Sequence, residues 1–177
     1  MFGVKDKTKD IIDSVWCDQY YIVAAREDAP SKSEVKKFFK QKAVPLPKEF
    51  LTHTTNFWGS FYLEVKEDIW PRATAGDVGP FWTFLYGMFV YTFSEEAPEW
   101  MNIEVATNEF EEMGHNVIPV LKVMGDADMY CISSEGDIVR YLHEEDIFEP
   151  YDGNFFDLLV YEVNELESRR IKYNEKS

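Results

Sequence analysis

The sequence has little cysteine and no run of apolar residues long enough to cross a bilayer. Its two cysteines, Cys17 and Cys131, are too few for a disulfide framework or a four-thiolate zinc site. The longest uncharged stretch, residues 78–94, is interrupted by glycine and proline and falls short of the roughly 20 apolar residues of a membrane helix. Residues 1–10 contain no apolar stretch that could serve as a secretory signal. We therefore expect a soluble cytoplasmic protein without a membrane partner.

Basic residues are also scarce, and they are unevenly placed. The 177 residues include 33 acids against 18 lysines and arginines, for a formal net charge of −15. Nucleic-acid phosphates would repel such a chain, so nucleic acid is excluded as a partner. Residues 73–168 hold 21 acids and only two bases, Lys122 and Arg140, whereas residues 1–72 are nearly neutral. Repulsion within one half of a chain destabilises its fold, and this imbalance favours a cationic protein partner.

Motifs for catalysis are missing too. The chain has no glycine-rich phosphate loop, no GxSxG elbow and no HExxH pair. Its histidines, His53, His115 and His143, share no metal-ligand spacing and are expected at the surface or at helix ends. Cys131 lies in a strand pattern, where a buried and inert thiol is expected. We expect a protein that is not an enzyme and that needs no cofactor.

One acidic set leaves a metal-dependent enzyme open as a minor alternative. Asp126 and Asp128 resemble the start of a calcium-binding loop, but Cys131 stands where that loop needs glycine. The acids at 144–146 could join the two aspartates around a divalent cation. Acids in exposed turns are the commoner case, so no metal site is expected here.

Residue periodicity predicts a single α+β domain with a mainly antiparallel sheet packed with helices. The patterns indicate helices near residues 11–16, 31–40, 47–58, 97–113 and 154–168, and strands near 60–65, 81–93, 117–123, 129–133 and 138–142. Residues 81–93 fit either one strand or two strands broken at Gly87. Strands that follow one another without a helix between them favour antiparallel pairing. Ser31 or Ser33 is expected to cap a helix, and Gly59 is expected to end one with a positive φ.

The main domain is expected over residues 31–170. Residues 1–30 precede it as an N-terminal extension for which the sequence indicates no role, and residues 171–177 follow as a polar tail. The length of the chain fits one domain of this kind.

Four segments, in order along the chain, carry a resemblance to a known family. The first is LPKEFL at 46–51 closing at NFWG (56–59), similar to an LPxxFxxFxxxxNGG-type helix in which Ser60 replaces the second glycine. The others are Ile118-Pro119 followed by GDADMYC (125–131), GDIV (136–139) followed by His143-Glu144, and FFDLL (155–159). Together they resemble the SUKH superfamily, which includes fungal cell-wall assembly regulators and bacterial immunity proteins.

This resemblance implies a SUKH-like α+β domain without catalysis that acts by binding protein. Immunity proteins of the superfamily neutralise a cognate polymorphic toxin, often a nuclease. Nuclease toxins tend to be basic where they grip nucleic acid, so we expect the acidic half of the chain to face such a toxin and to speed its capture. A non-catalytic regulatory adaptor or scaffold, like the fungal members, is the alternative. The oligomeric state stays open between monomer and homodimer.

Partner contacts are expected from acids and large aromatics at loop positions within or beside the acidic half. Large aromatics supply much of the binding energy at interface centres. The candidate partner-binding residues, near the first predicted strand and around the hairpin turns, are Trp58, Asp68, Trp70, Asp126, Asp128, Glu135, Asp137, Glu144, Glu145 and Asp146.

Overall fold

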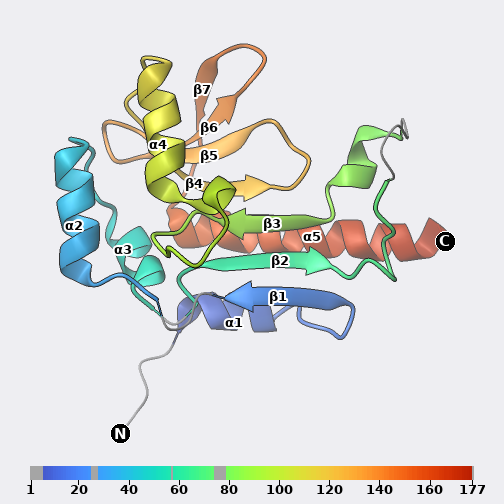
Figure 1. Cartoon of the computed structure of the whole chain (residues 1–177). Helices are drawn as coiled ribbons and strands as arrows, with labels where there is room; N and C mark the ends of the chain where they lie inside the picture. The colour runs from blue at the N-terminus through green and yellow to red at the C-terminus, as the bar shows by residue number, and fades with distance from the viewer. Residues whose placement is uncertain (1–5, 25–27, 57, 74–78, 177) are drawn as a thin grey trace, which may run out of the picture.

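The computed structural model describes residues 6–24, 28–56, 58–73 and 79–176. Within these residues, seven strands form one sheet in which each strand pairs antiparallel with the next along the chain (Figure 1). The strands are β1 (Tyr20–Ala24), β2 (Phe61–Val65), β3 (Gly87–Val90), β4 (Ile118–Val123), β5 (Met129–Ile132), β6 (Ile138–Leu142) and β7 (Ile147–Pro150). The predicted α+β class with a mainly antiparallel sheet is therefore confirmed.

Helices cover both faces of this sheet. In the described part of the chain they are α1 (Lys7–Asp13), α2 (Lys32–Gln41), α3 (Lys48–Thr54), α4 (Ile103–Glu112) and α5 (Phe155–Lys176), with the 3-10 helices η1 (Phe81–Phe84) and η2 (Glu99–Met101). Helix α5 runs along one face, behind β2 and β3 in Figure 1, while α4 packs against β4 on the other. None of the described helices is long and apolar enough to cross a membrane.

Successive side chains of β5 point to opposite faces of the sheet, one toward α5 and the next toward α4. The hydroxyl of Tyr130 donates to the Glu162 carboxylate of α5 at 2.7 Å. Its neighbour Cys131 points the other way and packs in a cluster with Phe110 of α4 and Tyr141 of β6. Cys131 is fully buried, as the sequence predicts, and this burial raises the pKa of its thiol.

Helix α2 begins where the sequence predicts a cap. The Ser31 hydroxyl accepts a hydrogen bond from the Glu34 amide at 3.2 Å, and the Glu34 carboxylate accepts one from the Ser31 amide at 2.6 Å. This reciprocal pair satisfies amides that a helix otherwise leaves without partners at its start. Val35, Phe38 and Phe39 then face the core. The cap fixes both the direction of α2 and the position of the Glu34 side chain.

Residues 7–24, for which the sequence indicates no role, belong to the fold. They form α1, which packs against α5, and β1, the edge strand that pairs with β2. Ile12 and Tyr20 are buried in the main core. At the other end of the chain, residues 171–176, expected as a polar tail, continue helix α5.

The structure corrects two expectations about strands. Residues 81–84, interpreted as part of a strand, form η1 directly after Pro80, and only Gly87–Val90 pairs in the sheet. The ring of Pro80 restricts φ to a value that suits the start of a helical turn, and its carbonyl accepts a hydrogen bond from the Thr83 hydroxyl at 2.6 Å. The short strand β7, which no sequence pattern indicates, extends the sheet beyond β6.

The prediction that Gly59 ends a helix with a positive φ is wrong. Helix α3 ends before Thr55, which keeps a right-handed conformation, and positive φ values occur at other described glycines. Gly59 is required because a Cβ there would lie 2.5 Å from the carbonyl oxygen of Thr54 and closer still to that of His53. The Gly59 amide donates to the carbonyl of Asn56 at 3.0 Å. The chain thus turns back tightly over the end of α3.

His53 lies in the last turn of α3, one of the two kinds of place that the sequence predicts for it, but its side chain is fully buried rather than exposed. Its Nδ1 atom lies 2.7 Å from the hydroxyl oxygen of Thr8 in α1. The rings of Phe50, Phe61 and Phe155 pack around its imidazole. Because water cannot hydrate a charged imidazole at this place, burial lowers the pKa of His53 to about 3.

Replacing Gly59 with alanine should lower the free energy of unfolding by about 2–3 kcal/mol, because the added methyl group must displace backbone atoms. Gly114→Ala is the matched control. Gly114 has a φ of 87° with open space around its Cβ position, so only backbone strain of about 1 kcal/mol is expected. Urea denaturation of both variants measures the difference. Equal losses would contradict the close approach at Gly59.

His53 should make the protein less stable as the pH falls below 6.5. The unfolded chain takes up a proton near pH 6.5, whereas the buried imidazole stays neutral down to about pH 3. Between pH 6.5 and about pH 5 this difference removes about 2 kcal/mol from the free energy of unfolding. The non-titrating His53→Asn variant should lose this part of the pH dependence, and Thr8→Val, which keeps the imidazole, should retain it. Identical slopes for wild type and His53→Asn in urea denaturation across this pH range would refute the assignment.

Candidate functional site

The predicted partner-binding acids lie at both ends of the sheet. In an antiparallel meander, alternate turns fall at opposite ends. The β4–β5 turn with Asp126 and Asp128 therefore shares one end with the β6–β7 turn at residues 144–146. The β5–β6 turn with Glu135 and Asp137 lies at the other end. The predicted acids therefore form two groups at opposite ends of the sheet.

Of the three residues predicted near β2, only Asp68 is exposed. Trp58 is half-buried against the core. Trp70 is 1% exposed, its ring stacks on Tyr173 of α5 with 4.6 Å between centroids, and its Nε1 donates to the carbonyl of Thr83 at 3.0 Å. An indole held in this way is part of the core and offers a partner almost no surface.

Arg140 engages Asp126 and Asp128 within the fold. Its guanidinium lies 3.1 Å from the Asp128 carboxylate and 3.5 Å from that of Asp126. The other oxygen of Asp128 accepts a hydrogen bond from the His143 amide at 2.9 Å. This side chain therefore joins the β4–β5 turn to the end of β6. Both carboxylates are half-buried and paired, which makes them less available to a partner.

Asp146 is also engaged within the protein. It adopts a φ of 53°, accepts a hydrogen bond from the Tyr141 hydroxyl at 2.9 Å and lies 2.7 Å from Nε2 of His115. The hydrogen bond with His115 lowers the pKa of the Asp146 carboxyl. Over the described ranges, no three His, Cys, Asp or Glu side chains are placed to hold a metal ion. The remaining exposed acids of the predicted hairpin set are Glu135, Asp137, Glu144 and Glu145.

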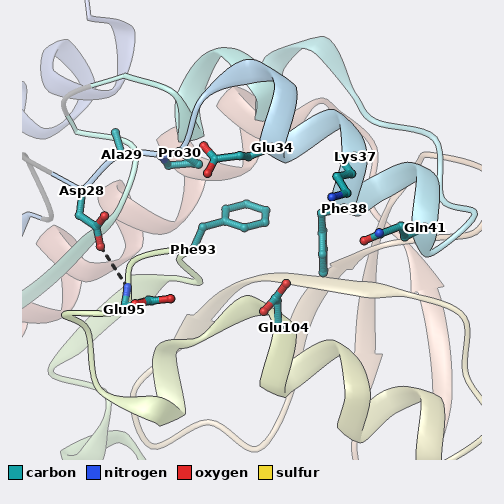
Figure 2. Close-up of a pocket in the computed structure, with 10 residues that line it drawn as sticks. All are labelled: Asp28, Ala29, Pro30, Glu34, Lys37, Phe38, Gln41, Phe93, Glu95 and Glu104. Carbon is teal, nitrogen blue, oxygen red and sulfur yellow. Dashed lines mark hydrogen bonds between the residues drawn. The ribbon is translucent and has the colours of Figure 1, made fainter.

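A different set of acids meets in a pocket between α2 and α4, here called the acidic pocket (Figure 2). Its volume is about 380 Å³. Phe38 and Phe93 form its floor, with ring centroids 5.2 Å apart in an edge-to-face arrangement. Four carboxylates line its rim, those of Asp28, Glu34, Glu95 and Glu104.

Hydrogen bonds in the segments before α2 and α4, and at the start of α4, position this rim. The Asp28 carboxylate accepts hydrogen bonds from the Ser94 hydroxyl at 2.8 Å and from the Glu95 amide at 3.1 Å, the second of which is dashed in Figure 2. Asp28 thereby ties the segment before α2 to the segment before α4. Asn102 caps α4 by accepting from the Glu104 amide at 2.9 Å, which places Glu104 in the first helical turn. The Asp28 carboxylate and the backbone at Glu95 and Glu104 are therefore held by contacts within the protein.

The acidic pocket carries more negative charge than nearby bases neutralise. Its four carboxylates face one ammonium group, that of Lys37. In the described part of the chain, no ion pair joins Glu95 or Glu104 to a base. Hydrogen bonds from Ser31 lower the pKa of the Glu34 carboxyl and keep it ionised. An anionic rim over an aromatic floor suits a cationic side chain.

Sequence patterns do not single out this pocket, because its residues come from segments far apart in the chain. Asp28 and Glu34 belong to the nearly neutral first part, where nothing distinguishes them from other surface acids. Glu95 and Glu104 lie in the acidic half, and that position is the one signal that could have pointed to them. The two pairs meet because α2 and α4 lie on opposite sides of the pocket.

Comparison of the chain with models of protein families, with curated proteins and with solved structures finds no match. The resemblance to the SUKH superfamily therefore stays a prediction that depends on the order and spacing of its motifs.

Charge reversal at Asp128 should destabilise the protein even though the residue lies in a turn. Asp128→Lys removes the hydrogen bond to the His143 amide and places a second cation beside Arg140, so a loss of about 1–2 kcal/mol is expected. Glu144→Lys makes the same change in charge at an exposed site and should alter the free energy of unfolding by less than about 0.5 kcal/mol. Urea denaturation compares the two variants. A loss at Asp128 no larger than that at Glu144 would show that its contacts are not stabilising.

Proposed function

We propose that this protein binds a cationic protein and that the acidic pocket receives a basic side chain of that partner. The observation that carries the proposal is the composition of the pocket, with four carboxylates around two phenylalanine rings and a single lysine to oppose them. The formal net charge of −15 adds attraction at longer range.

An arginine side chain would match the acidic pocket in charge and in shape. A guanidinium group is planar, stacks on aromatic faces and forms paired hydrogen bonds with carboxylates. The floor offers the half-buried ring of Phe93 beside that of Phe38. Hydrogen bonds already hold the carboxylates of Asp28 and Glu34, so little side-chain entropy is lost there on binding.

The uneven charge of the chain supports rapid capture of such a partner. Residues 73–168 hold 21 acids and two bases. A field of one sign steers an oppositely charged protein and raises the association rate, and salt weakens this effect. In this proposal the exposed acids of the β5–β6 and β6–β7 turns contribute to the field without forming the anchoring contact.

We further propose that the partner is a basic toxin and that binding neutralises it in the cytoplasm. This step depends on the SUKH resemblance, because the superfamily includes bacterial immunity proteins. Nucleases are the first toxins to test, since the surface that holds nucleic acid is basic. The acidic pocket supports a partner with basic side chains, and the SUKH resemblance supports a toxin as that partner.

Co-expression with the product of the adjacent gene tests this function. The expected result is a stable complex that weakens as salt is added and in which the partner loses its toxicity. A complex with a partner that has no toxic activity would favour the regulatory adaptor instead. A well-folded protein that captures no neighbouring gene product would contradict the immunity function.

Charge reversal in the acidic pocket should weaken that complex. Glu95→Lys combined with Glu104→Lys is expected to reduce affinity at least about tenfold, because two carboxylates that hold the basic side chain become repulsive. The matched control combines Glu109→Lys with Glu112→Lys, which changes the net charge equally at exposed sites on α4 outside the pocket. It should stay within about threefold of wild type in calorimetry. Equal weakening by both pairs would place the anchoring contact elsewhere.

A further inference from the structure

A second pocket, here called the cationic pocket, lies between η1 and the last turns of α5. It has a volume of about 220 Å³ and is lined by Trp70, Trp82, Arg169, Lys172, Tyr173 and Lys176. Three of these residues are bases and none is an acid, in a protein whose acids outnumber its bases 33 to 18. We propose that the cationic pocket binds a carboxylate carried on an aromatic body, and this proposal does not depend on the proposed function.

Arg169 provides a buried donor in the wall of this pocket. Its Nε donates to the carbonyl of Leu85 at 3.0 Å, which fixes the guanidinium beside the end of η1. Its Nη2 is buried and has no hydrogen-bond acceptor among the described residues. An unpaired donor in a protein interior costs free energy, and the positive charge of Arg169 adds to the charges of Lys172 and Lys176 around the pocket.

Neighbouring acids do not neutralise the cationic pocket. Burial lowers the pKa of Arg169, and attraction from Glu162 and Glu165 opposes that shift without forming an ion pair. Over the described ranges, Lys172 and Lys176 form no ion pair either. The positive charge of the pocket is therefore available to an anion.

The aromatic wall of the pocket is built from rings that hold one another in place. Trp70 and Tyr173 stack with 4.6 Å between centroids and 13° between planes. The ring of Trp82 lies 6.3 Å from that of Tyr173 and is 42% exposed, with Nζ of Lys176 at 4.9 Å from its centroid. A ligand ring can pack against the exposed part of the Trp82 ring, which the other two rings support, while its carboxylate reaches the bases.

The size of the pocket limits the ligand to one small group. Its volume is below the ~300–1,000 Å³ of pockets that hold larger ligands, so a single ring with an acid group is the expected occupant. Such a group has two sources, a free aromatic acid or the carboxy-terminus of a peptide that ends in an aromatic residue.

Calorimetric titration of the full chain with small probes tests the proposal. Phenylacetate should bind at least about tenfold more tightly than neutral phenylacetamide, because the bases recognise the charge. Phenylacetate should also bind more tightly than inorganic phosphate, because phosphate has no ring to pack on Trp82. Equal binding of phenylacetate and either of these probes overturns the proposal.

Peptides distinguish the two sources of the ligand. A peptide that ends in phenylalanine with a free carboxylate, bound at least about tenfold more tightly than its amide, would identify a chain end as the ligand. Binding of phenylacetate without binding of the peptide would identify a free aromatic acid. The absence of saturable binding by phenylacetate and by both peptides in the millimolar range overturns the proposal.

Substitutions in the cationic pocket test whether phenylacetate binds there. Arg169→Gln should weaken binding at least about tenfold. Lys172→Ala and Trp82→Leu alter exposed residues, so both variants should fold even if Arg169→Gln does not. Each should weaken binding at least about threefold. Lys36→Ala, an exposed lysine of α2 outside the pocket, is the matched control and should bind like wild type. Unchanged affinity in Lys172→Ala and Trp82→Leu overturns this location for the site.

Discussion

Burial of the apolar side of α5 against the sheet is the contact on which the surrounding elements depend. From the start of this helix, a continuous chain of packed rings leads to the floor of the acidic pocket through Phe155, Phe50, Phe39, Phe38 and Phe93. Each large apolar side chain that is fully buried contributes roughly 1.5–3 kcal/mol. The position of the pocket floor therefore follows from the packing of the core, and the hydrogen bonds at the rim only orient the acids above it.

The last turns of α5 form much of the wall of the cationic pocket. Tyr173 stacks on Trp70, which fixes the aromatic wall, and the bases Arg169, Lys172 and Lys176 lie within about two turns of one another on the same helix. Basic residues are favourable near the carboxyl end of a helix, because they complement its partial negative charge. The same preference that stabilises the helix end thus concentrates positive charge in a protein with a large excess of acids. The acidic pocket takes its charge from the segments around α2 and α4, whereas the cationic pocket takes its charge from the last turns of α5.

Local patterns were sufficient for the fold class and for most elements, because periodicity and capping act over a few residues. They failed where a residue's surroundings come from distant segments. His53 resembles a surface residue until Thr8 and Phe155 enclose it. Trp70 occupies a loop position, but its exposure is decided by the helix that follows about a hundred residues later. The acidic pocket joins Asp28 to Glu104, and no spacing along the chain indicates such a pair.

Because α5 follows all seven strands in the sequence, it is the last of the described elements to leave the ribosome. Until α5 docks, the sheet face that includes Met88 and Leu121 lacks the helix that covers it in the folded protein. Newly made chains with uncovered apolar sheets tend to associate. The acids that precede α5 give each nascent chain a strong negative charge, which keeps neighbouring chains apart. The charge excess thus opposes association between chains whose core is still incomplete.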